Sequence, residues 1–244
     1  MSEQQLADAT RRNDDYDRLT VEIIERVCGP AAVTVDLGAG VGEITRHLVR
    51  VAPRGTHFAV EPLPALADEL AARLPSVTLV RAAAADTSGP RAFVHVVSNP
   101  GYSGLRRRPY DRPDENLREI TVETVRLDDV VPADLGVDLI KIDVEGGEVV
   151  ALRGAAGLLR RDGPVIVFEH GGDPVMREYG TTTDDLWSLL VDDLGYRVFT
   201  LPAWLAGEPA LDRAALTAAL QRDWYFVADR PAGSTTDEQK GSDR

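Results

Sequence analysis

Hydrophobic residues in this chain form short apolar runs that alternate with segments of helical spacing. Near the beginning, two apolar runs, Thr34–Leu37 and Thr56–Glu61, lie on either side of Glu43–Val51, where apolar positions recur every three to four residues. This pattern predicts a strand, a helix and a second strand in succession. Because the same alternation continues along the chain, it predicts an α/β protein built on a mostly parallel sheet.

The same criteria predict the remaining elements. The predicted strands are Thr34–Leu37, Thr56–Glu61, Val77–Arg81, Val137–Asp143, Val165–Glu169, Tyr196–Leu201 and Trp224–Ala228. The predicted helices are Tyr16–Val27, Glu43–Val51, Pro62–Leu74, Glu148–Arg160 and Thr183–Leu194. Two further segments, Arg91–Val97 and Ile120–Leu127, alternate with a period of two and predict an additional hairpin-like pair of strands.

A glycine-rich turn follows the first predicted strand. Gly38, Gly40 and Gly42 allow the backbone to adopt positive φ and to approach a ligand closely. The unpaired N–H groups of the following helix favour an anion or a carboxylate. A dinucleotide fingerprint requires its third glycine at position 43, where Glu43 would instead repel a pyrophosphate. The turn therefore favours a phosphate-free zwitterion such as S-adenosylmethionine.

Carboxylates lie at the ends of the first predicted strands. Glu61 follows Asp36 by 25 residues, and a strand-end acid at about this distance accepts hydrogen bonds from the ribose hydroxyls of a bound nucleoside. Asp86, after the third strand, either accepts from the adenine amino group or forms a turn. We predict that Asp36, Gly38, Gly40, Glu61 and Asp86 bind the cofactor.

Several sequence blocks resemble those of a known family. Val35–Thr45, Val125–Asp129, Ile140–Glu148 and Pro164–Glu169 are similar to motifs of the FkbM family of S-adenosylmethionine-dependent methyltransferases. One departure is Gly40, where the family often carries asparagine. The resemblance implies the class I methyltransferase fold, a Rossmann-like doubly wound seven-stranded sheet with its last strand antiparallel. Here we expect an extra β insertion after the third strand.

Methyl transfer to a hydroxyl needs a group that removes the hydroxyl proton. Asp143 ends the fourth predicted strand, and Glu169 and His170 end the fifth, so we expect all three to meet at one edge of the sheet. In position they resemble the ligands of magnesium-dependent catechol O-methyltransferases. We predict Asp143, Glu169 and His170 as catalytic residues and as ligands of a divalent metal. Without a metal, His170 is the alternative general base.

The acceptor is predicted to be a small molecule. Between the two period-two strands lies Ser98–Arg118, a long segment typical of a lid or binding loop. Its three consecutive arginines, 106–108, either meet an anionic substrate or form a solvated surface run. The family resemblance implies O-methylation of a hydroxyl on a sugar or on a polyketide-type natural product.

Composition limits the class of protein further. At 244 residues and 43% hydrophobic content, the chain can form one domain, expected at residues 31–230, after a helical lead-in at 1–30 and before a disordered tail at 231–244. The net charge of -13 argues against a nucleic-acid partner. The single cysteine, Cys28, excludes an intrachain disulfide. The absence of a leader or of a long apolar run predicts a cytoplasmic protein without a membrane partner.

Two other functions stay open on the sequence alone. One is an oxidoreductase with a nucleotide cofactor, which Glu43 disfavours. The other is a catalytically silent module that binds S-adenosylmethionine, which the strand-end acids disfavour. The sequence leaves open the identity of the acceptor, the position of methylation, the need for a metal and whether the chain forms a homo-oligomer.

Overall fold

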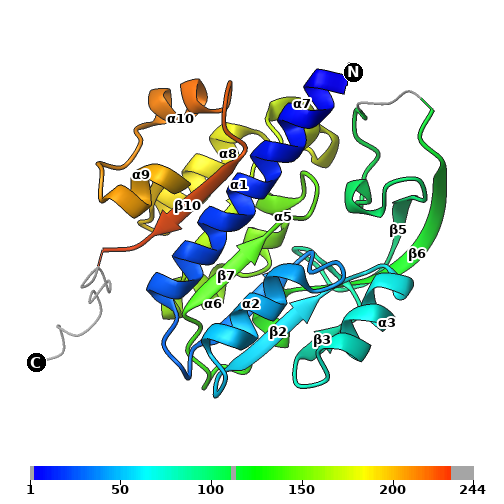
Figure 1. Cartoon of the computed structure of the whole chain (residues 1–244), viewed down its shortest axis with the longest axis horizontal. Helices are drawn as coiled ribbons and strands as arrows, with labels where there is room; N and C mark the ends of the chain where they lie inside the picture. Colours follow the sequence, from blue (N-terminus) through cyan, green and yellow to red (C-terminus); the bar gives the residue numbers. More distant parts are fainter. Residues whose placement is uncertain (1–2, 111–113, 232–244) are drawn as a thin grey trace, which may run out of the picture.

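The computed structural model describes residues 3–110 and 114–231 (Figure 1). Its centre is a seven-stranded sheet in the order β3-β2-β1-β7-β8-β10-β9. The strands are β1 (Val33–Leu37), β2 (Thr56–Val60), β3 (Thr78–Val80), β7 (Leu139–Ile142), β8 (Val165–Glu169), β9 (Arg197–Thr200) and β10 (Tyr225–Asp229). Of the predicted tail, 231–244, only residue 231 lies within the described residues.

Strand direction in this sheet follows the predicted class I arrangement. The pairs from β3 to β8 are parallel, whereas β10 pairs antiparallel with both β8 and β9. The predicted fold class is therefore confirmed. The strand order reverses at β1, which lies between β2 and β7, and ligands of open α/β sheets bind at the carboxyl ends of the strands at such a point.

Helices cover both faces of the sheet because successive residues of its buried central strands point to opposite sides. On one face lie α1 (Glu3–Val27), α2 (Glu43–Val51) and α9 (Leu201–Ala206), with α1 running diagonally across the sheet in Figure 1. On the other face lie α5 (Glu148–Arg153), α6 (Ala156–Asp162), α8 (Thr183–Trp187) and α10 (Arg213–Ala219). In β7, Leu139 packs with the first group and Ile140 with the second.

Helix α3 (Pro64–Arg73) follows β2, and its Leu70 packs with Ala39 and Ala59. The remaining helical elements are short: η1 (Pro100–Tyr102), α4 (Leu127–Val130), α7 (Asp173–Met176), η2 (Arg177–Tyr179) and the π-helix η3 (Ser188–Asp193). Among the described residues, no helix has both the length and the apolar character that a bilayer span requires.

The helices of the structure differ from the predicted ones in three respects. The first helix begins at Glu3 instead of Tyr16. The predicted helix Glu148–Arg160 is divided into α5 and α6 at Gly154, where a β-carbon would lie only 1.9 Å from the carbonyl oxygen of Ala85. Helices α9 and α10 were not predicted. The division into residues 1–30, 31–230 and 231–244 stays a prediction.

A second, three-stranded sheet follows β3 in the chain. It contains β4 (Ala83–Ala84), β6 (Leu117–Val125) and β5 (Gly89–Val96) in that order, and β5 and β6 form the predicted antiparallel pair. Figure 1 shows β5 and β6 beside α3, at the edge of the molecule. Phe93 and Val122 pack with Leu63 and Ala83 in a small apolar cluster, which joins this sheet to the end of β2.

Candidate functional site

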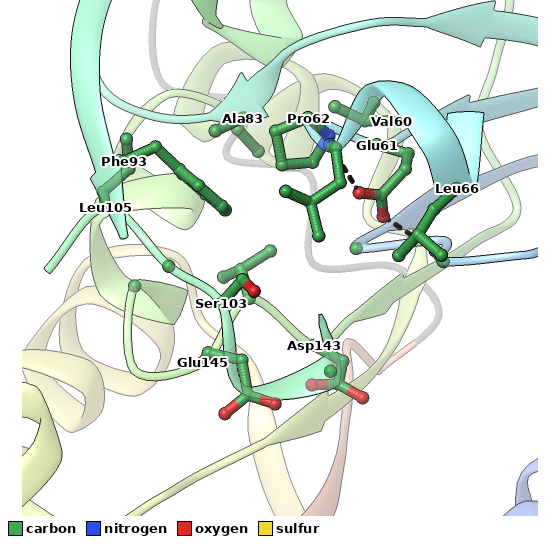
Figure 2. Close-up of a pocket in the computed structure, with 18 of the residues that line it drawn as sticks. Val60, Glu61, Pro62, Leu66, Ala83, Phe93, Ser103, Leu105, Asp143 and Glu145 are labelled. Carbon is green, nitrogen blue, oxygen red and sulfur yellow. Dashed lines mark hydrogen bonds between the residues drawn. The ribbon is translucent and has the colours of Figure 1, made fainter. Parts of the chain in front are cut away.

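A pocket opens at the carboxyl ends of β1, β2 and β7 (Figure 2). Its walls include Gly38 and Gly40 from the turn after β1, Glu61 from the end of β2 and Asp143 from the end of β7. Figure 2 shows Glu61 on one side of the cavity, and Asp143 with Glu145 on another. The pocket thus unites three of the predicted cofactor residues with one of the predicted catalytic residues.

The glycine turn brings the backbone against the site. Gly38 has φ +74°, and a β-carbon there would lie 1.8 Å from the carbonyl oxygen of Asp143. Gly40 has φ +56°, but nothing lies within 4 Å of the position of its β-carbon. Gly38 is therefore required for the close approach of the ends of β1 and β7, whereas Gly40 lies in the pocket wall with open space at the position of its β-carbon.

Glu61 is fixed in the pocket by the backbone around it. It is buried; its Oε2 accepts from the Gly40 N–H and its Oε1 from the Leu63 N–H, both at 2.8 Å. Burial raises the pKa of Glu61, although the two N–H groups oppose this shift. Each carboxylate oxygen retains a second acceptor position. The side chain is thus suited to accept two hydroxyl groups.

Asp36, a predicted cofactor residue, does not line the pocket. Its side chain is fully buried beneath the turn, where Oδ2 accepts from the Thr45 hydroxyl of α2 at 2.6 Å. The contact joins the end of β1 to the first turns of the helix. Asp36 therefore supports the glycine turn from beneath and does not line the pocket.

Asp86 lies outside the pocket as well. By residue 86 the chain has passed β4, and Asp86 lines a neighbouring cavity together with Arg91 and Arg106. Leu105 and Tyr179 line both cavities. The predicted contact from Asp86 to adenine is thus not supported by its position, because the direction of the chain changes after β4.

Three carboxylates meet beside the pocket, and two of them, Asp143 and Glu145, are seen at its lower end in Figure 2. An oxygen from each of Asp143, Glu145 and Glu169 lies within 4.8 Å of the other two. Asp143 Oδ2 also accepts from the Tyr225 hydroxyl at 2.6 Å and lies 3.3 Å from Lys141 Nζ. Burial favours the neutral form of Asp143, but Lys141 and Tyr225 prevail and lower its pKa.

The pKa of Glu169 is shifted in the opposite direction. Burial, followed by the negative charges of Asp143 and Glu148, raises the pKa of Glu169 well above its ordinary value. Of the two side chains, Glu169 is therefore the one that binds a proton first, and it then donates a hydrogen bond to the Asp143 carboxylate. A carboxylate next to a neutral carboxylic acid is suited to accept a further proton during a reaction.

His170 is not brought to these carboxylates. It is absent from the cluster, and its Nδ1 accepts from the N–H of Gly172 at 3.0 Å while its ring packs edge-on against Phe226. Burial lowers the pKa of His170 to about 4, so the ring is neutral at physiological pH. The prediction of a ligand set of Asp143, Glu169 and His170 is not supported, because His170 turns into the core where β8 ends.

Glu145 is held in the pocket by an unusual backbone. Its φ is +59°, which only a few per cent of non-glycine residues adopt. Glu148 Oε1 accepts from the N–H groups on either side, those of Val144 at 3.3 Å and Gly146 at 3.1 Å. The Glu145 carboxylate forms an ion pair with Arg108. Such conformations persist at sites where the surroundings fix them.

The Glu148 carboxylate is fully buried, and we expect it to make folding stability depend on pH. Burial raises its pKa from 4.5 to about 7. Between these values the unfolded chain releases a proton that the folded chain keeps, so stability decreases as the pH rises. Replacing Glu148 with glutamine preserves an oxygen for the two N–H groups and removes this cost, on the order of 2–3 kcal/mol.

The measurement is the melting temperature of the wild type and of Glu148→Gln at pH 5 and pH 8. We expect the variant to gain stability relative to the wild type at pH 8 only. Glu208→Gln, at an exposed position after α9, is the control for loss of one charge. An equal difference at the two pH values would contradict the raised pKa.

The segment between β5 and β6 supplies another wall of the pocket. Ser103 accepts from the Val96 N–H at 3.0 Å, and Gly104 pairs with Val94, so residues 103–105 are held against β5. Of the three consecutive arginines, only Arg108 reaches the carboxylates; it also stacks on Tyr102 at 5.1 Å. The three arginines thus do not converge on one anion. Arg106 and Arg107 are exposed, which agrees with the alternative prediction of a solvated surface run for these two residues.

Several residues of this site were not assigned from the sequence. Glu145, Tyr225, Lys141 and Tyr179 are not among the cofactor-binding, catalytic or metal-binding residues that the sequence predicts. Tyr225 reaches Asp143 because β10 lies beside β8, with Tyr225 opposite Glu169. Tyr225 and Asp143 are brought together because the last strand, β10, lies antiparallel between β8 and β9. The one local signal was the lysine within an apolar strand, which requires an acidic partner.

Comparison with known proteins identifies the family. The sequence profile described as the methyltransferase FkbM domain matches residues 36–198, which is more than half of the chain. The chain belongs to the FkbM methyltransferase family. The matched region begins within β1 and includes the glycine turn, the second sheet and the acidic cluster. The pocket therefore lies within the FkbM domain.

Solved structures show the same fold. The FkbM methyltransferase from Methylobacillus flagellatus KT is 17% identical with a TM-score of 0.50, and the alignment covers 82% of this chain and 44% of that one. The chain thus spans less than half the length of that protein. A TehB-like methyltransferase from Corynebacterium glutamicum is 12% identical, with coverage of 93% and 97% and a TM-score of 0.45.

A third similar structure contains a cofactor. Fibrillarin from Aeropyrum pernix, solved with natively bound S-adenosyl-L-methionine, is 15% identical, with coverage of 83% of this chain and 67% of that one and a TM-score of 0.43. No curated protein matches the sequence. What the comparisons establish for this chain is therefore its membership of the FkbM methyltransferase family.

Proposed function

We propose that this chain transfers the methyl group of S-adenosylmethionine to a hydroxyl oxygen of a small molecule. The observation that carries the proposal is the single pocket that joins the glycine turn and Glu61 at one end with the Asp143 carboxylate at the other. The two ends correspond to the two requirements of the reaction, a held cofactor and a group that accepts a proton.

In this proposal the half of the pocket next to β1 and β2 binds the cofactor. Glu61 accepts the ribose hydroxyls, and the backbone of Gly38 and Gly40 lies against the methionine portion. Leu63 and Phe93 supply apolar surface for the adenine ring. Asp143, the strand-end carboxylate across the pocket, would then be the side chain nearest the methyl group that the bound cofactor supplies.

The chemical step then requires only groups in the pocket. The acceptor oxygen attacks the methyl carbon, the carbon–sulfur bond breaks, and its electron pair remains on sulfur as S-adenosylhomocysteine. The hydroxyl becomes strongly acidic as the oxygen–carbon bond forms, so a carboxylate suffices to take the proton. Asp143 is that base, since Lys141 and Tyr225 keep it ionised. Alignment of the reacting groups supplies much of the remaining rate, about 7–11 kcal/mol of the barrier.

A divalent metal is the other way to activate the hydroxyl, but the residues do not fit one. The oxygens of Asp143, Glu145 and Glu169 are of the type that Mg²⁺ binds. However, Arg108 forms an ion pair with Glu145, and the Tyr225 hydroxyl donates to Asp143, so both carboxylates already have partners. We therefore propose metal-independent transfer, and expect turnover to persist in excess EDTA.

The acceptor end favours a neutral molecule with several hydroxyl groups. Its charged lining side chains, Asp143 and Glu145, are hydrogen-bond acceptors, and the nearby cations Lys141 and Arg108 are already paired with them. An anionic acceptor would meet repulsion there. A sugar or polyketide hydroxyl therefore agrees better with the site than a sugar phosphate, and the net charge of -13 disfavours nucleic acid.

The test begins with calorimetric titration of S-adenosylmethionine and S-adenosylhomocysteine into the full chain. It continues with detection of S-adenosylhomocysteine after incubation with a panel of glycosides and hydroxylated polyketides, with and without EDTA. Binding together with transfer to a hydroxyl supports the proposal. Absence of binding at millimolar cofactor contradicts it, and loss of transfer on chelation contradicts its metal-independent form.

Glu61 gives a specific prediction for the cofactor end. Glu61→Gln leaves one acceptor oxygen where two are needed, so we expect affinity for S-adenosylhomocysteine to fall by about 10–100-fold, as for lost hydrogen bonds to a charged group. Calorimetry measures this loss. Glu69→Gln, on the exposed side of α3, is the matched control and should bind like the wild type. Equal affinity in the two variants would remove Glu61 from the site.

A further inference from the structure

Lys141 lies in β7 with its ammonium surrounded by oxygen atoms. Only 7% of the side chain is exposed. Its Nζ lies 3.3 Å from Asp143 Oδ2, 3.5 Å from the carbonyl oxygen of Gly38 and 3.7 Å from Asp36 Oδ1. The sheet register brings these groups together, because Lys141 is directly opposite Asp36 in the β1–β7 pair.

These oxygens belong to different parts of the site. Gly38 and Asp36 belong to the cofactor turn, and Asp36 is bonded in turn to Thr45 at the start of α2. Asp143 belongs to the acceptor end and faces the pocket. One ammonium group therefore connects the structure that holds the cofactor with the carboxylate that takes the proton.

The choice of lysine at this position has a geometric reason. The chain has 27 lysines and arginines together, and only positions 141 and 240 are lysine. An ammonium directs three N–H bonds along diverging directions, whereas a guanidinium presents its donors in one plane. Oxygens supplied by a strand acid, a turn carbonyl and a strand-end acid suit the first arrangement.

We propose that Lys141 is a positioning residue that fixes the Asp143 carboxylate relative to the cofactor turn, so that the base faces the reacting methyl group. This inference rests on the proposed function, since it assigns Asp143 the role of base. It adds a residue that is outside the pocket wall and touches neither cofactor nor acceptor.

The charges around Asp143 explain why the loss of Lys141 would matter. Besides Lys141, the titratable groups that interact with Asp143 are Asp17 from α1, Glu145 and Glu148 from the segment after β7, Glu169 from β8 and Tyr225 from β10. Asp36 from β1 is the other acid beside the Lys141 ammonium. Most of these groups are acidic. Without the ammonium, Asp143 is driven to bind a proton or to turn away, and in either state it cannot serve the acceptor hydroxyl.

The first variant is Lys141→Met, which preserves the length of the side chain and removes its charge. We expect kcat to fall by at least about 100-fold, the scale of general-base catalysis, with the acceptor KM changed by less than about threefold. Because this variant leaves Asp36 buried without a counter-ion, it also loses thermal stability. A second variant is needed to separate the two effects.

That variant is Lys141→Met combined with Asp36→Asn. Asparagine removes the buried charge on β1 and keeps an oxygen for the Thr45 hydroxyl. We expect the melting temperature and the affinity for S-adenosylhomocysteine to return toward the wild type while kcat stays low. Recovery of kcat in the double variant would overturn the inference, because Lys141 would then serve only to neutralise Asp36.

The control is the combination Arg197→Met and Asp229→Asn, which removes an ion pair of 2.8 Å at the far edge of the same sheet. Its kcat should equal that of the wild type. If the wild type itself binds no S-adenosylhomocysteine or methylates no hydroxyl, the proposed function fails. If the wild type does both and the double variant matches it, only the role of Lys141 fails.

Discussion

Replacing Asp143 with asparagine is expected to lower kcat by about 10²–10⁴-fold, the range for loss of a general base. Asparagine is isosteric and can still accept from the Tyr225 hydroxyl, but its amide does not take up a proton. Affinity for S-adenosylhomocysteine should be retained, because the cofactor contacts come from the turn and from Glu61. The measurements are steady-state methyl transfer and calorimetry on the same protein.

The matched control for Asp143→Asn is Asp229→Asn. Asp229 also lies at a strand end, its side chain is 17% exposed against 25% for Asp143, and it pairs with Arg197 on the far side of the sheet. Turnover should be unchanged in this control. Should Asp143→Asn retain more than a tenth of wild-type kcat, a different group must remove the proton.

Gly38→Ala is expected to lower both the free energy of unfolding and the affinity for the cofactor, and to combine these two losses more than any other substitution proposed above. A β-carbon at this position would meet the Asp143 carbonyl oxygen at 1.8 Å, and the backbone φ of +74° is unfavourable for alanine. The conformational cost and the overpacking sum to about 2–5 kcal/mol. Relief of the clash requires the ends of β1 and β7 to separate, which displaces the turn. Chemical denaturation and calorimetry measure the two losses.

Gly207→Ala separates the clash from the backbone conformation. Gly207 follows α9 with φ +71°, and nothing lies within 4 Å of its β-carbon position. This variant should lose only the conformational part, about 1–2 kcal/mol, and should bind cofactor normally. If the two variants were equally stable, the contact between Gly38 and Asp143 would not be a constraint on the fold.

Most of the fold was predictable because its elements are defined by local patterns. Helix α2 matches the predicted Glu43–Val51, and strand β8 matches the predicted Val165–Glu169. The interruption at Gly154 was not predictable, because it depends on the Ala85 carbonyl, which is distant in sequence. Helices α9 and α10 are short, and segments of six or seven residues show too few turns for their period to be recognised.

The candidate site was predictable to the extent that strand ends define it. Glu61 and Asp143 lie in the pocket because each directly follows a parallel strand at the same edge of the sheet. His170 and Asp86 follow strands too, but each is turned elsewhere by the path of the chain after it. The contacts of Tyr225 arise from the order of the strands in space, which the sequence alone does not specify.

The position of β10 has a consequence for the order in which the site is completed during synthesis. The turn, Glu61 and the apolar wall at Ala83 and Phe93 all precede residue 94, whereas Tyr225 lies in the final described strand. A nascent chain can therefore contain the whole proposed cofactor half while Asp143 still lacks its hydroxyl partner. Under the proposed function, the base at Asp143 is completed late, after the ribosome has translated the strand that enters between β8 and β9.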